Sequence, residues 1–235
     1  MKIEVCRTAG EVARRGAALV AAALVRNPCE VMALPTGRTP VAMYAELAAK
    51  RKAGSVDFSC ATVFNLDEVL LPNPDPHTFF QFMRRHVWEP LGVAAERRFI
   101  PDGGAHDPVA ECVRYEASIE RAGGLGIAVL GIGSDGHIAY NLPGQIASRT
   151  HVVTLDRATV ATLGRSIKGE VRAITMGIET IREARSLVLL ATGSSKAEAL
   201  RRLRDHPRSE DWPCTFFRDH ADLLVVADAA AAAQL

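Results

Sequence analysis

Short runs of apolar residues, each followed by a polar loop, constrain the fold of this chain more than any other feature. A run of four or five such residues fits a strand that is buried on both faces of a sheet. Helical stretches separate most of the runs, and this alternation predicts a mostly parallel sheet with helices on both faces, a Rossmann-like, doubly wound α/β fold. The runs lie at residues 30–34, 61–64, 127–130, 152–155, 171–175, 186–190 and 223–226.

Capping signals place several of the intervening helices. Thr8, with a glutamate three residues later, forms a capping box and predicts a helix that ends near residue 26. Pro40 predicts the first position of a second helix, because a missing N–H costs nothing there. Asp107 before a proline predicts the start of a third, which the glycines at 123–124 end.

Composition indicates one globular domain. The chain has 235 residues, of which 48% are hydrophobic and 23% charged, without an internal repeat or a linker-like stretch. We therefore predict a single domain over residues 1–235, with the alanine-rich tail 228–235 either a last helical turn or frayed. The net charge of +1 offers no electrostatic attraction to nucleic acid or to a membrane surface. The most apolar stretch, residues 17–25, is too short to cross a bilayer, and no signal-peptide pattern opens the chain, so we expect a cytoplasmic protein.

The cysteines and histidines suggest neither a disulfide framework nor a metal site. The five cysteines are odd in number and lack a C-x-x-C pair, so we expect free thiols in a reducing cytosol. The seven histidines are scattered, without an H-E-x-x-H motif. We expect no metal and no cofactor.

Two glycine-containing loops are candidate phosphate sites. The first comprises Thr36, Gly37, Arg38 and Thr39, between a strand and the start of a helix. Free backbone N–H groups and the positive end of the helix dipole suit an anion there, although a plain turn explains this loop equally well.

In the second loop, Ser195 and Glu198 form another capping box, and Lys196 occupies the first helical turn. A cation opposes the helix dipole at that position, which indicates that Lys196 serves an anion. The two loops together favour a phosphate pocket.

Two further loops carry groups for acid–base chemistry. Asp67 and Glu68 follow a wholly apolar strand. A carboxylate there can be a base with a pKa raised by burial, able to take a proton from a carbon beside a carbonyl, or simply a solvated loop residue. In residues 131–137, Asp135 can orient His137, and Gly136 permits a turn that other residues resist. Ligands bind beyond the carboxyl ends of strands in open α/β sheets, so we expect one site at that edge.

These motifs resemble those of the glucosamine-6-phosphate deaminase family, whose superfamily also contains 6-phosphogluconolactonases. The resemblance covers residues 8–228 and follows the family's order. It implies that His137 opens the sugar ring with Asp135 beside it, and that Asp67 moves a proton from C2 toward C1. Fructose 6-phosphate and ammonia would then form from glucosamine 6-phosphate. The motifs lie at residues 34–40, 64–68, 131–141, 148–150 and 193–197. The candidate substrate and phosphate contacts are Thr36, Gly37, Arg38, Thr39, Glu68, Gly136, Arg165 and Lys196.

The sequence departs from this family at informative positions. Leu142 stands where deaminases have a glutamate that assists ring opening, and Arg38 replaces a small residue. A 6-phosphogluconolactonase, which needs no enolisation base, is therefore the second hypothesis. Val69, where lactonases have arginine, counts against it. A different amino-sugar phosphate as substrate, isomerisation without deamination, and a catalytically impaired sugar-phosphate-binding relative are also compatible with these departures. A transcriptional sensor would need a DNA-binding helix-turn-helix, which we do not find. We expect a monomer or a small homo-oligomer.

Overall fold

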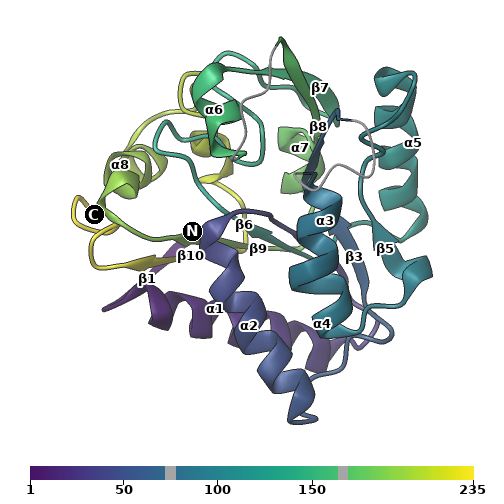
Figure 1. The fold of residues 1–235 in the computed structure, drawn as a ribbon. Helices are drawn as coiled ribbons and strands as arrows, with labels where there is room; N and C mark the ends of the chain where they lie inside the picture. The colour runs from purple at the N-terminus through teal and green to yellow at the C-terminus, as the bar shows by residue number, and fades with distance from the viewer. Residues whose placement is uncertain (72–77, 164–168) are drawn as a thin grey trace.

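A seven-stranded parallel sheet forms the centre of the molecule (Figure 1). The computed structural model describes residues 1–71, 78–163 and 169–235. The strand order is β1-β10-β9-β6-β2-β3-β5, which confirms the predicted doubly wound α/β class. The strands are β1 (Lys2–Cys6), β2 (Val31–Leu34), β3 (Thr62–Asn65), β5 (Arg98–Phe99), β6 (Ile127–Leu130), β9 (Ser186–Ala191) and β10 (Leu223–Asp228).

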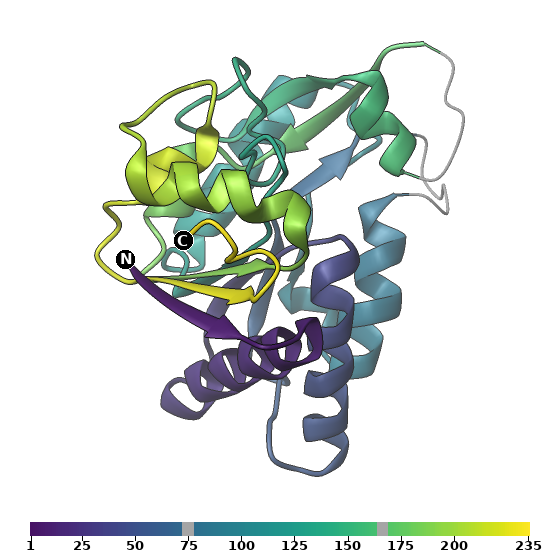
Figure 2. The same cartoon turned by 90° about the vertical axis from the view of Figure 1, so that its left-hand side faces the viewer.

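Helices cover both faces of this sheet, as Figures 1 and 2 show. Successive side chains of a strand point to opposite faces, so Met32 packs under one helical layer and Ala33 under the other. The first layer contains α1 (Ala9–Arg26), α2 (Arg38–Lys52), α3 (Phe79–Met83), the π-helical turn η1 (Arg84–Trp88) and α4 (Glu89–Leu91). The second contains α5 (Pro108–Arg121), α7 (Ile178–Arg182), α8 (Ala197–Asp205) and the 3₁₀ turn η4 (Pro213–Phe217). Short 3₁₀ turns also form at η2 (Ala95–Arg97) and η3 (Ser194–Lys196).

A second, antiparallel sheet lies beside the first and was not expected. Its order is β4-β8-β7, and its strands are β4 (Asp67–Val69), β7 (His151–Leu155) and β8 (Val171–Thr175). Residues 152–155 and 171–175 are strands as predicted, but they do not join the parallel sheet. Asp67 and Glu68 lie in a strand rather than a loop. The helix α6 (Arg157–Thr162) follows β7, and both lie at the top of Figure 1.

Local capping follows the sequence in part. Thr8 accepts a hydrogen bond from the backbone of Glu11 at 3.2 Å, and Asp107 caps α5, as predicted. Pro40 is the third residue of α2 rather than the first, because the helix already begins at Arg38. The predicted second capping box is wrong. The carboxylate of Glu198 binds arginines on its own helix, and no side chain caps α8.

The expectation that all cysteines are free is also wrong, because Cys29 and Cys60 form a disulfide. Strands β2 and β3 pair in parallel with Val31 opposite Thr62. Each cysteine stands two residues before its member of that pair, so the register brings their Cα atoms to 4.6 Å. The remaining cysteines, Cys6, Cys112 and Cys214, are free. Within the described ranges, no helix combines the length and apolar character needed to cross a membrane.

Candidate active site

Four polar loops meet at the carboxyl edge of the parallel sheet. They follow β9, β6, β2 and β3, which are neighbours in that order. The direction of winding changes between β2 and β6, and open α/β sheets bind ligands at such a switch point. The loops after β2 and β9 touch directly, because the hydroxyls of Thr39 and Thr192 lie 3.2 Å apart. The structure therefore brings the loops after β2 and β9 into contact and places the segments after β3 and β6 at the same sheet edge.

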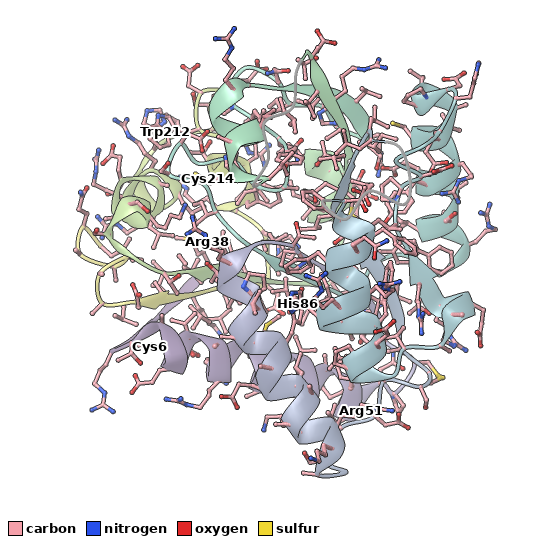
Figure 3. All side chains as sticks on the ribbon, in the orientation of Figure 1. Cys6, Arg38, Arg51, His86, Trp212 and Cys214 are labelled. Carbon is pink, nitrogen blue, oxygen red and sulfur yellow. A yellow bond between two sulfur atoms is a disulfide. The ribbon has the colours of Figure 1, made fainter. Side chains whose placement is uncertain are left out.

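The phosphate-site candidates lie around the start of α2. Gly37 has a φ of 109°, a left-handed conformation that favours glycine, and no side chain caps the helix that follows it. Arg38 lies between this helix start and α8 (Figure 3). Burial lowers the pKa of Lys196, Asp135 opposes that shift, and Arg38 adds to it. The positive charges of Arg38 and Lys196 thus repel one another beside backbone N–H groups that no side chain caps. Such an arrangement is suited to an anion.

His137 and Asp135 form a close pair. Nδ1 of His137 lies 2.7 Å from Oδ1 of Asp135, which leaves Nε2 as the nitrogen available to a substrate. Burial alone would raise the pKa of Asp135, but the contacts with His137 outweigh it and bring the pKa to about 2. Gly133 is required beneath the pair, because a Cβ there would collide with both side chains.

Asp67 is buried at the start of β4. The residue is 6% exposed, and Oδ1 has no hydrogen-bond partner in the part of the chain that the structure describes. Burial raises its pKa to about 8, and the charge of Glu68 contributes. The backbone of Asp67 is held from below: Asn65 Nδ2 donates to its carbonyl at 2.5 Å, and the Tyr115 hydroxyl donates to the carbonyl of Asn65 at 2.7 Å.

Glu68 points away from Asp67, because successive residues of a strand face opposite sides. Its carboxylate accepts the backbone N–H groups of Val69, Phe79 and Phe80 at 2.8, 2.8 and 2.7 Å, and so caps the start of α3. Burial raises the pKa of Glu68 to about 7 against the effect of these bonds, and Asp102 adds to the rise. Its predicted contact with substrate stays a prediction.

Comparison with known proteins decides the family. A model of the family "Glucosamine-6-phosphate isomerases/6-phosphogluconolactonase" matches residues 6–226. This chain belongs to that family. The glucosamine-6-phosphate deaminase of Shewanella loihica is 41% identical, over 100% of this chain and 90% of the relative. That of Clostridioides difficile is 36% identical, over 100% and 97%.

Solved structures agree with this assignment. The structure of a monomeric glucosamine-6-phosphate deaminase superposes with a TM-score of 0.94 at 36% identity, and the match covers 100% of both chains. The 6-phosphogluconolactonase of Trypanosoma brucei has a TM-score of 0.78 at 20% identity, over 100% of this chain and 98% of that one. At that identity the likeness concerns the fold.

In this chain, the surroundings of Leu142 are apolar. Leu142 is 4% exposed and belongs to a cluster beneath the small sheet. The cluster's buried members are Val69, Leu71, Tyr140, Leu142, Val153, Leu155, Val171 and Ala173. Leu142 is therefore surrounded by apolar side chains at the position where the resemblance assigns a carboxylate.

Sequence reasoning missed the support behind the His137 loop. Gly136 has a φ of 82°, and a Cβ there would press on Trp212 and Cys214, which Figure 3 labels. Its carbonyl accepts the N–H of Cys214 at 2.8 Å. No local signal in residues 212–214 announces this contact, because it depends on the tertiary fold. Arg165, the remaining predicted phosphate contact, lies outside the described residues.

Proposed function

We propose that this protein converts glucosamine 6-phosphate to fructose 6-phosphate and ammonia. The observation that carries the proposal is the buried carboxyl of Asp67 at the same sheet edge as the His137–Asp135 pair and the uncapped start of α2. Deaminases of this name align with the whole chain at 36–41% identity and support the same reaction.

In the proposed mechanism, the phosphate fixes the position of the sugar. The phosphate is held by two loops and one further predicted contact. These groups are Thr36, Gly37, Arg38 and Thr39 in the first loop, Lys196 in the second, and Arg165. A fixed phosphate sets the distance from the reacting carbons to the catalytic groups, which lowers the entropic part of the barrier. Gly136 belongs to the His137 loop, which we place against the sugar ring.

Ring opening comes next. His137 Nε2 takes the proton of the anomeric hydroxyl, the C1–O5 bond breaks as the C1=O1 bond forms, and the imidazolium gives that proton to O5. Asp135 holds Nδ1 and stabilises the imidazolium that forms. The product is the open-chain aldehyde with its amino group on C2.

Asp67 then acts as the enolisation base. It removes the proton from C2, the electron pair forms the C1=C2 bond, and the negative O1 takes a proton from the substrate's ammonium group, which becomes a neutral amine. Asp67 returns its proton to C1, which leaves an iminium at C2. Water adds to this carbon and ammonia leaves, so the last step is a hydrolysis. The positive amino group of a bound substrate favours ionised Asp67 against the effect of burial.

The deciding experiment supplies the purified protein separately with glucosamine 6-phosphate and 6-phosphogluconolactone. We expect ammonia and fructose 6-phosphate from the first substrate. Rapid lactone hydrolysis without ammonia would instead establish a lactonase. The apolar surroundings of Leu142 favour that alternative, because lactone hydrolysis does not need a carboxylate to open a hemiacetal ring.

We further propose that the enzyme works in the cytoplasm, on a sugar phosphate, as a monomer or small homo-oligomer. The full-length match to a deaminase described as monomeric supports the monomer. Light scattering on the purified protein measures its mass directly, against 25.3 kDa for one chain.

A further inference from the structure

Tyr140 differs from the other tyrosines of the chain in the surroundings of its hydroxyl. The chain has three tyrosines. The hydroxyl of Tyr44 donates to the carbonyl of Pro35 at 2.6 Å, and that of Tyr115 donates to Asn65 at 2.7 Å. Buried tyrosines usually find such a partner. The hydroxyl of Tyr140 makes no hydrogen bond with any described residue, although the residue is only 8% exposed.

The ring of Tyr140 is nevertheless held in place. It stacks on Phe79 with centroids 5.9 Å apart and packs in the apolar cluster that contains Leu142. Its backbone N–H donates to the hydroxyl of Thr175 at 3.0 Å. A side chain fixed in this way, with a donor at its tip that no described residue uses, is positioned to bind a ligand.

The same contacts place Tyr140 on the side of the small sheet that carries Asp67. Asp67 and Thr175 are opposite each other across β4 and β8, and opposite residues share a face. Val69 lies on that face too, two residues after Asp67, and it belongs to the cluster of Tyr140. Oδ1 of Asp67 is buried and has no hydrogen-bond partner among the described residues. The Tyr140 hydroxyl is not one of these buried atoms and reaches accessible space.

We propose that the Tyr140 hydroxyl is a further catalytic group, which donates a hydrogen bond to the substrate oxygen that becomes negative during proton abstraction. The inference rests on the proposed function and deepens it. When Asp67 takes the C2 proton, the C2–H electron pair forms C1=C2 and the carbonyl pair moves onto O1. The phenol stabilises this charge and keeps its own proton.

Two properties of the surroundings suit this role. Burial, with the charges of Asp67 and Glu68 adding to it, raises the pKa of Tyr140 above its usual value, so the phenol remains a donor at working pH. Its neighbours, Leu142 among them, are apolar, and a hydrogen bond to a developing charge is stronger where water is excluded.

The test is Tyr140→Phe, which keeps the ring and its stacking and removes one oxygen. We expect kcat to fall by roughly 10²-fold with KM little changed, the loss typical of one oxyanion donor. The melting temperature should not change, because the hydroxyl has no partner among the described residues. Tyr115→Phe is the matched control and should lower the melting temperature. Wild-type kcat in Tyr140→Phe, or a kcat loss that tracks a lower melting temperature, would overturn the proposal.

A binding measurement separates this inference from the proposed function. A hydroxamate analogue of the open-chain sugar phosphate imitates the planar, negative intermediate, and fructose 6-phosphate represents a ground state. We expect Tyr140→Phe to bind the hydroxamate at least about tenfold more weakly and fructose 6-phosphate equally well. Equal binding of both would refute the role of Tyr140. If the wild-type protein released no ammonia but this difference persisted, deamination would fail and the donor role would stand.

Discussion

At the scale of single residues, the site separates two aspartates by their surroundings. The pKa of Asp67 is raised to about 8, by burial first and by Glu68 second. The pKa of Asp135 falls to about 2, because contact with His137 outweighs burial. Carboxyl groups whose pKa values are pushed apart in this way identify a proton acceptor and a permanent charge. Asp67 suits proton transfer, and Asp135 suits orientation of the imidazole.

The raised pKa of Asp67 predicts the pH dependence of activity. The base must be ionised, so kcat/KM should rise with pH through a midpoint near 8, the pKa of the free protein, rather than near 4. Asp67→Asn should reduce kcat by roughly 10³-fold and leave the affinity for fructose 6-phosphate nearly unchanged. Initial rates between pH 5 and 10 and calorimetric titration measure both quantities. Full activity in Asp67→Asn would remove Asp67 from the mechanism.

At the scale of elements, the sequence predicts strands better than it predicts their partners. Four-residue apolar runs locate β2, β3 and β6 within a residue or two, because burial on both faces demands that composition. The positions of the polar loops could be predicted too, because each apolar run ends where its strand leaves the buried sheet. The signal that β7 and β8 form another sheet was present in exposed Thr154 and Arg172, which interrupt the apolar runs. The pairing of β4 with β8 could not be read, since it joins residues about a hundred positions apart.

The cap on α3 gives a prediction at this scale. Glu68 accepts N–H groups with both oxygens, and Glu68→Gln would turn an NH₂ group toward one set of them. We expect a loss of about 1–3 kcal/mol in the free energy of unfolding, measured in urea, from the unsatisfied donors. Because the raised pKa of about 7 means that the folded state holds the proton more tightly than the unfolded chain, the contribution of Glu68 to stability is lost as pH rises through 7. The difference between the variant and the wild type should therefore depend on pH between 4 and 8.

This variant also tests the predicted substrate contact of Glu68. A capping role predicts lower stability with a KM close to that of the wild type. A direct contact with the sugar predicts a higher KM with unchanged stability, and that result would contradict the capping role of Glu68.

At the scale of the whole molecule, the parallel sheet keeps a stabilising disulfide and the candidate active site at opposite ends of its strands. The amino ends of β2 and β3 carry the disulfide, and their carboxyl ends carry the phosphate loop and the strand of Asp67. The sequence conceals this disulfide, because cysteine spacing alone does not reveal it. Strand order and register do: once β2 and β3 are neighbours in register, Cys29 and Cys60 must lie side by side.

The disulfide should therefore change stability without changing turnover. It closes a loop with a sequence separation of 31, and the chain-entropy relation gives about 3–4 kcal/mol of stabilisation through the unfolded state. Cys29 is exposed, so a reductant can reach the bond. We expect dithiothreitol, or the double variant Cys29→Ser/Cys60→Ser, to lower the free energy of unfolding by that amount while kcat and KM stay constant. Cys112→Ser is the control, because this thiol is free and buried. Reductant should affect this variant and the wild type equally. A fall in kcat on reduction would mean that the amino ends of β2 and β3 control the geometry of the loops at their other ends, and the separation of the two roles would be refuted.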